Sequence, residues 1–204
     1  MRGTFKAADV EVLTGISIEA QKGWNKRSEK LGLDRLGEGN GHRNYNLVDL
    51  CFFVLIELLK SRGVQLNEAL SGALSRESSA DVAPRYIDAC SDIRMRLASV
   101  FATHIVELPV DTDVMLYVPM QGQHHVPTWF LSALPSEAHA GVGGVDPAIS
   151  LDAVYDAVLA ADNVISVNVS RLARRLIEKL QTHGVALLKQ REAVNAFFGE
   201  ADAE

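Results

Sequence analysis

The sequence predicts an α+β fold, in which a mostly helical N-terminal region with one small hairpin precedes a mixed α/β region. Three observations support this fold class: helix-spaced apolar residues with capping residues recur up to Leu74, an Asn40-Gly41 pair interrupts them, and three short strand-like segments lie further on. With 204 residues, of which 48% are hydrophobic, the chain has enough apolar surface for one medium domain or two small ones.

A short turn separates the first two expected helices. Val10 and Leu13 share one face of a short helix that ends at Gly15, a residue that tolerates a left-handed turn. Ser17 is a good N-cap for the second helix, whose inner face carries Trp24. The other face is expected to carry Gln21, Lys22, Asn25 and Glu29. A helix, a turn and a second helix in this order are typical of the helix-turn-helix motif of DNA-binding proteins.

A hairpin and two more helices are expected next. The Asn40-Gly41 pair lies within residues 35–45 and is a strong hairpin signal. Asn46 then caps a third helix, and Asp49 stands in its first turn, where a negative charge suits the helix dipole. Gly63 ends that helix, and a short fourth helix covers residues 66–74. The apolar stripe of the third helix consists of Leu47, Leu50, Val54 and Leu58, widened by Cys51 and Leu55.

The rest of the chain alternates helices and strands after a polar segment that ends at Pro84. Strands are expected at residues 114–118, 128–133 and 164–169, and helices at residues 85–102, 151–161, 170–183 and 185–198. Ser170 is the expected cap of the helix that reaches His183, and Arg174 is expected to pair with Glu178. We therefore predict three parts: a first domain at residues 1–74, a linker at residues 75–84, and an α/β domain at residues 85–204.

The charge of the chain is unevenly distributed. The formal net charge is −6, yet residues 1–63 hold ten Lys or Arg against eight Asp or Glu, and residues 64–204 hold ten against eighteen. Between Arg96 and Arg171 there is no Lys or Arg at all. Because a surface that grips a polyanion needs basic side chains, a nucleic-acid contact is expected in the N-terminal region and excluded from the acidic segment.

Several short segments of the N-terminal region occur in a characteristic order. They are Phe5-Lys6-Ala7-Ala8-Asp9-Val10, Leu13-Thr14-Gly15-Ile16-Ser17, Trp24-Asn25-Lys26-Arg27, His42-Arg43-Asn44-Tyr45, Asp49-Leu50 and Leu58-Leu59-Lys60-Ser61-Arg62-Gly63-Val64. In this order they resemble the N-terminal domain of the MerR family of transcription regulators, over roughly residues 4–74. The resemblance implies a winged helix-turn-helix, in which the second helix reads the major groove and a hairpin wing with an Arg-x-Tyr sequence touches the DNA backbone.

The resemblance assigns DNA-contacting roles to two elements. Lys22, Asn25 and Lys26 fall on the recognition helix, and Arg43 and Tyr45 fall on the wing. This agrees with the chemistry of the residues, because basic side chains bind phosphate, and Asn or Gln on a helix can read adenine. Tyr45 has a second interpretation, as a core aromatic under the wing. The full set of candidate DNA contacts is Ser17, Gln21, Lys22, Asn25, Lys26, Arg27, Lys30, Arg35, His42, Arg43 and Tyr45.

The acidic region offers weaker signals. His104, His124, His125 and His139 lie there with acidic residues, which raises the hypothesis of a metal sensor, although no spacing matches a known ligand motif. Trp129, Phe130 and Tyr117 fit either a small-molecule pocket or an ordinary core. His124, Asp113 and Ser132 are the residue types of a catalytic triad, but nothing in their spacing supports one. We accordingly expect no catalytic site, no bound metal and no cofactor.

Taken together, these patterns predict a cytoplasmic transcription regulator that binds double-stranded DNA and is not an enzyme. No signal-peptide segment follows Met1, and the longest apolar run, at residues 50–56, is too short to span a membrane. Because one winged domain makes few phosphate contacts, we expect a homodimer, with a small-molecule effector or a protein partner at the C-terminal domain. Two alternatives stay open: an excisionase-like architectural protein that bends DNA, and a protein-interaction adaptor whose DNA-binding domain is vestigial.

Overall fold

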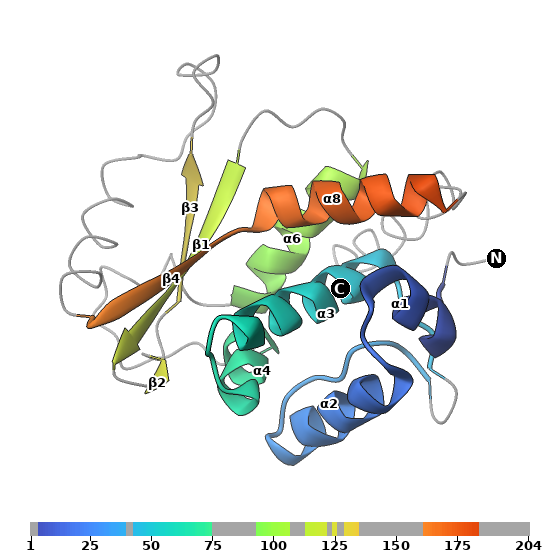
Figure 1. Cartoon of the computed structure of the whole chain (residues 1–204), viewed down its shortest axis with the longest axis horizontal. Coiled ribbons are helices and arrows are strands. Elements are labelled where there is room, and N and C mark those ends of the chain that lie inside the picture. Colours follow the sequence, from blue (N-terminus) through green and yellow to red (C-terminus); the bar gives the residue numbers. More distant parts are fainter. Residues whose placement is uncertain are drawn as a thin grey trace, which may run out of the picture.

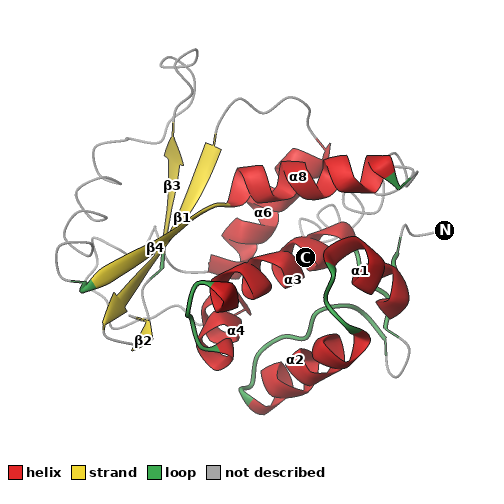
Figure 2. Cartoon of the chain, viewed as in Figure 1, coloured by secondary structure: helices red, strands yellow, loops and turns green. Residues whose placement is uncertain are grey.

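The computed structural model describes residues 4–39, 43–74, 93–106, 113–121, 124–125, 129–134 and 161–183 (Figure 1). Within these ranges the chain has six helices and a four-stranded antiparallel sheet, which confirms the α+β class. The helices gather on one side of the view and the strands on the other (Figure 2). None of the helices in this part of the chain is long and apolar enough to cross a lipid bilayer.

The first two helices begin and end where the capping residues predict. Helix α1 covers Ala7–Thr14 and ends at Gly15, whose φ of 79° is left-handed. Helix α2 covers Ile18–Lys30, and the Ser17 hydroxyl accepts a hydrogen bond from the Ala20 amide at 3.2 Å. The glycine stop and the serine cap together set a tight turn between two helices that contact each other.

Two short backbone pairings follow α2. Glu38 and Asn44 exchange backbone hydrogen bonds of 2.8 and 3.0 Å, and Phe5 and Tyr45 exchange bonds of 2.7 and 2.9 Å. The Asn40-Gly41 turn and His42 lie outside the described residues, but the antiparallel pairing on either side of them is that of a hairpin. The Phe5 pairing holds the start of the chain against the returning arm of this hairpin.

Helix α3 covers Leu47–Ser61 and helix α4 covers Leu66–Leu74. A capping box begins α3: the Asn46 side chain accepts from the Asp49 amide and the Asp49 carboxylate accepts from the Asn46 amide, both at 2.8 Å. The expected apolar stripe is too narrow, since Phe52, Phe53, Ile56 and Leu59 are also buried while Val54 and Leu58 are only half-buried. The reason is that neighbours cover α3 on more than one side.

Strand β1 (Asp113–Gln121) is the centre of the sheet. It pairs antiparallel with β2 (His124–His125), β3 (Phe130–Leu134) and β4 (Asn163–Asn168). Because β4 pairs with residues of β1 that also pair with β2 or β3, it lies on the opposite edge of β1 from both of them. The three expected strand segments are therefore confirmed, with β1 longer than predicted.

Helix α8 (Val169–Thr182) contacts both β1 and α3, and helix α6 (Ile93–Val106) packs against α8, α3 and α4. The expected cap of α8 is wrong: Asn168 accepts from the Arg171 amide at 2.7 Å, whereas the Ser170 hydroxyl accepts from the Val114 amide of β1 at 2.9 Å. The expected pairing of Arg174 with Glu178 is also wrong, because Arg174 forms an ion pair with Asp113. Both corrections have one cause, which is that the first turn of α8 packs against β1.

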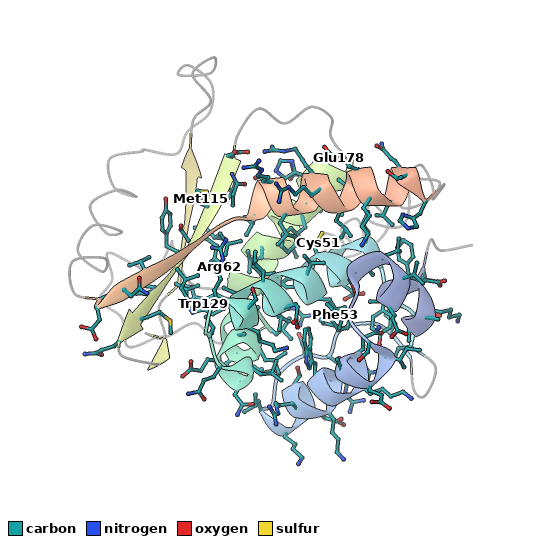
Figure 3. The ribbon with its side chains drawn as sticks, in the orientation of Figure 1. Cys51, Phe53, Arg62, Met115, Trp129 and Glu178 are labelled. Atoms are coloured by element: carbon teal, nitrogen blue, oxygen red, sulfur yellow. The ribbon has the colours of Figure 1, made fainter. Side chains whose placement is uncertain are left out.

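The hydrophobic core continues from the N-terminal helices into the sheet region. The Phe52 ring of α3 meets the Phe101 ring of α6 edge to face at 5.4 Å. Arg94 of α6 forms an ion pair with Asp34, and Arg62 at the end of α3 donates to the Ser166 carbonyl of β4. Figure 3 labels Arg62 and Trp129 in the region where α3 and α4 meet the strands. The linker predicted at residues 75–84, the helices predicted at 151–161 and 185–198, and Cys90 lie outside the described residues.

Candidate nucleic-acid interface

The two faces of α2 differ from the sequence-based prediction. The sequence places Gln21 and Asn25 on the face opposite Trp24, yet all three are buried with Ser28 along one face. Positions 21, 24, 25 and 28 have the spacing of one helix face, and polar residues are tolerated there when their amides find partners. The Gln21 amide donates to the carbonyls of Ala7 at 3.0 Å and Ile16 at 2.9 Å. These bonds attach α2 to the start of α1 and to the turn between the two helices.

Asn25 plays a similar part on the hairpin side. Its Oδ1 accepts from the Leu36 amide at 2.9 Å, which fixes the chain where it leaves α2 and enters the hairpin. Gln21 and Asn25 are therefore supports of the fold in this structure, and neither reaches outward to read a base edge. This corrects the part of the candidate set that rested on amide readout of adenine.

The outward face of α2 is basic. The basic side chains exposed there are Lys22, Lys26, Arg27 and Lys30, together with the acidic Glu19 and Glu29. None of the four basic side chains forms a hydrogen bond or ion pair with the described part of the chain. Ser17 is exposed at the start of the helix, where its hydroxyl is used as the cap. The outward face therefore presents positive charge that is available for a partner.

A hollow of about 870 Å³ lies between α1, α2 and the hairpin. Three segments of the chain contribute its basic residues: Lys6 precedes α1, Lys22 and Lys26 belong to α2, and Arg43 belongs to the hairpin. The remaining lining residues are Ala7, Ala8, Ile18, Gln21, Asn25, Glu29 and Tyr45. With four basic side chains and the single carboxylate of Glu29, the lining of the hollow carries an excess of positive charge, which favours an anion over a cation.

Lys6 is absent from the sequence-based candidates, although it stands in one of the segments that carry the family resemblance. Its Nζ donates to the Asn44 side chain at 2.5 Å, so it is fastened to the hairpin. The signal that could have found it is the pairing of Phe5 with Tyr45, because this pairing brings residue 6 next to residue 44. No spacing within the sequence predicts the pairing of Phe5 with Tyr45, because these residues are 40 positions apart.

Arg43 and Tyr45 occupy the returning arm of the hairpin. The Arg43 guanidinium donates to the carbonyls of Leu36 at 3.1 Å and Gly37 at 3.4 Å, and the side chain is half-buried. Tyr45 is only 3% exposed, and its ring lies edge to face on Phe53 at 5.3 Å. Burial raises the pKa of Tyr45, while the charge of Arg43 lowers it. Tyr45 is thus a core aromatic under the hairpin, the second of the two interpretations.

The other candidates lie apart from the hollow. Arg35 forms an ion pair with Glu29, and the carboxylate partly neutralises the positive charge that Arg35 presents to a partner. Arg27 and Lys30 are exposed on α2 but do not line the hollow. His42 lies outside the described residues. The structure therefore gathers Lys22, Lys26 and Arg43 around one concavity with Lys6, and leaves Ser17, Arg27, Lys30 and Arg35 around it.

The acidic region holds no assembled catalytic or metal site in its described part. His124 pairs with Gln121, at the opposite end of β1 from Asp113. At the usual rise of a strand the two ends of β1 are about 26 Å apart, so the structure does not bring these two candidate triad residues together. No group of three His, Cys, Asp or Glu side chains in the described ranges could hold a metal ion. Burial lowers the pKa of His104, and nearby Arg174 lowers it further. His139 lies outside the described residues.

Trp129, an aromatic residue of the same region, packs in the core. Trp129 is buried, and its ring lies directly on Gly72 of α4. Tyr117 of β1 is half-buried and pairs with Phe130 of β3. This favours the ordinary core over a small-molecule pocket at Trp129, whereas the side chain of Phe130 lies outside the described part of the chain.

Comparison with family models, with curated proteins and with solved structures found no match for the chain.

Proposed function

We propose that the protein binds double-stranded DNA through the outward face of α2 and the hairpin, as a winged helix-turn-helix regulator of the kind that the sequence resembles. The observation that carries the proposal is the convergence of Lys6, Lys22, Lys26 and Arg43, from three segments, on one hollow beside an exposed basic helix. Basic residues that meet from separate segments form a local concentration of charge that a polyanion recognises.

The arrangement of the elements supports the same proposal. Helix α2 follows α1 after a turn fixed by Gly15 and Ser17, and the hairpin arms lie beside α2 through Asn25 and Leu36. Gly23 is exposed at the middle of the outward face, with no atom near its missing side chain. A helix with a glycine at that point can approach a groove closely, because no side chain holds it away.

The burial of Gln21 and Asn25 changes how bases would be read. The exposed basic residues of α2 bind phosphate without regard to sequence, and Lys or Arg can also donate to the O6 and N7 atoms of guanine. We therefore propose that sequence preference rests on Lys22, Lys26 or Arg27 at guanine rather than on an amide at adenine.

Affinity for duplex DNA should fall steeply with salt, since each bound phosphate contributes about −0.9 to the slope of log affinity against log salt concentration. Replacing Lys22 and Lys26 by glutamine should weaken binding and reduce the slope by about one for each phosphate that the variant no longer binds. Fluorescence anisotropy with a labelled duplex, at several salt concentrations, measures both quantities. Arg175→Gln is a charge-matched control, because Arg175 is exposed on α8 and is not among the residues that line the hollow.

Two results would contradict the proposal: a slope near zero, or equal reductions in affinity for the α2 variants and the α8 control. Absence of duplex binding even at low salt favours the adaptor alternative. Strong bending of the duplex, measured by energy transfer between labels at its two ends, favours the excisionase-like alternative. We further propose a homodimer in the cytoplasm with an effector or partner on the sheet region, and light scattering measures the mass that decides the dimer.

A further inference from the structure

The segment that leads from α2 into the hairpin is attached to helix α6. Asp34 lies in this segment and forms an ion pair with Arg94, which stands in the first turn of α6, 60 positions further along the chain. The side chains of Arg94 and Asp34 are 18% and 35% exposed, so water and salt screen this pair less than the more exposed pair of Arg35 with Glu29. The pair therefore ties the position of residue 34 to that of α6.

Helix α6 can serve as a firm anchor because its inner face is part of the core. Leu97 and Phe101 are fully buried, and the Phe101 ring meets Phe52 of α3 edge to face at 5.4 Å. The same helix also contacts α4 and α8. Arg94 lies about one turn before Leu97, so this packing sets the position of its backbone.

A second acidic residue attaches the same segment to α3. The Asp49 carboxylate accepts a hydrogen bond from the Gly37 amide, and the positive charge of Arg94 also acts on this carboxylate. Arg94 thus faces two acids, Asp34 and Asp49, which hold the chain on either side of Leu36. Residues 34 to 37 are therefore positioned from α3 and α6 together.

The positioned segment in turn orients Arg43, one of the basic residues that line the hollow. The Arg43 guanidinium donates to the carbonyls of Leu36 at 3.1 Å and Gly37 at 3.4 Å. A shift of these two carbonyls would move the acceptors that hold the guanidinium beside the hollow. A continuous series of contacts therefore runs from α6 through Arg94 and Asp34 to Arg43.

We propose that Arg94 is a positioning residue through which α6 holds the hairpin and Arg43 in the arrangement that binds DNA. The inference rests on the proposed DNA-binding function and adds a means of control to it. A ligand or partner that displaces the start of α6 would change the affinity for duplex DNA, since the two states of the hairpin would bind the duplex differently.

Asp34→Asn separates positioning from simple electrostatics by the sign of its effect. Removal of a negative charge by itself raises the affinity for a polyanion. Loss of the ion pair should instead weaken duplex binding about fivefold, the lower end of typical coupling between sites, and Arg94→Gln should also weaken it. The double variant should bind no more weakly than the weaker single variant, because both substitutions break the same pair. Fluorescence anisotropy with a labelled duplex at one salt concentration measures these affinities.

Glu57→Gln is the matched control. It also replaces a carboxylate by an amide and breaks an ion pair, that of Glu57 with Lys60 on α3, and neither of these residues lines the hollow. This variant should bind duplex DNA as tightly as the natural chain or slightly more tightly. Higher affinity for Asp34→Asn, or equal changes in affinity for the Asp34 and Glu57 variants, would overturn the proposal.

Hydrogen exchange tests the positioning in the absence of DNA. The amides of Leu36 and Glu38 are hydrogen-bonded, and they should exchange faster in the Asp34 and Arg94 variants while the amides within α3 keep their protection. Unchanged exchange at Leu36 and Glu38, or faster exchange throughout α3 as well, would contradict a local positioning role. A protein that binds no duplex but shows the local effect loses the DNA-binding function and retains the positioning role of Arg94.

Discussion

Replacing Gly72 by alanine is expected to lower the free energy of unfolding by about 3 kcal/mol, the upper part of the range for overpacked cores. Gly72 lies in α4, and a Cβ placed there would overlap the six-membered ring of Trp129. The indole is buried between α4 and the sheet region, so it cannot move aside without opening the core. Urea denaturation followed by circular dichroism measures the change.

The control substitution, Gly23→Ala, is expected to change the free energy of unfolding in the opposite direction. Gly23 is also within a helix, but nothing lies near its missing side chain, so Gly23→Ala should raise the free energy of unfolding by about 0.5 to 1 kcal/mol. In a chain that carries Trp129→Leu, the cost of Gly72→Ala should shrink, because the overlapping ring is gone. An equal cost in both backgrounds would contradict the close approach of Gly72 and Trp129.

Replacing Asp49 by asparagine is expected to remove a pH dependence of stability. Burial raises the pKa of Asp49 to about 6, although hydrogen bonds from the Asn46 and Gly37 amides and the charge of Arg94 act in the other direction. A group whose pKa is raised on folding contributes stability that is complete below its unfolded pKa, near 4, and is lost as the pH rises through about 6.

The asparagine variant keeps the capping acceptor but has no proton to lose. It should match the natural chain near pH 4 and exceed its free energy of unfolding by up to about 3 kcal/mol at pH 8, at 1.36 kcal/mol for each pKa unit. Denaturation curves at pH 4, 6 and 8 for both chains test this. A variant that is less stable than the natural chain at pH 8 would show that the Asp49 carboxylate is stabilised, not penalised, by its surroundings.

Much of the helical framework is predictable from the sequence because local interactions determine it. Gly15 stops α1, Ser17 caps α2, and Asn46 with Asp49 forms the capping box of α3, each within a few residues of its partner. The start of α8 is not predictable in this way. Ser170 is a good capping residue, but its hydroxyl is drawn to the Val114 amide, 56 positions earlier in the chain.

The candidate site is only partly predictable for a similar reason. Residue type alone predicts Lys22, Lys26 and Arg43 as phosphate contacts, and the structure places these three around one hollow. Residue type misleads at Gln21 and Asn25, because an amide can read a base or satisfy a backbone group, and only tertiary structure shows that the backbone groups of Ala7 and Leu36 are in reach. Burial on a helix face depends on the neighbours of the face more than on its own polarity.

The neighbouring rings of Phe52 and Phe53 on α3 pack against two different groups of residues. Phe53 touches Trp24 at 5.8 Å and Tyr45 at 5.3 Å, between centroids, whereas the adjacent Phe52 meets Phe101 of α6. Because Phe52 and Phe53 are adjacent in one helix, both groups of rings pack against the same turn of α3. The position of this single turn of α3 is therefore shared by the packing of α6 on one side and of α2 and the hairpin on the other.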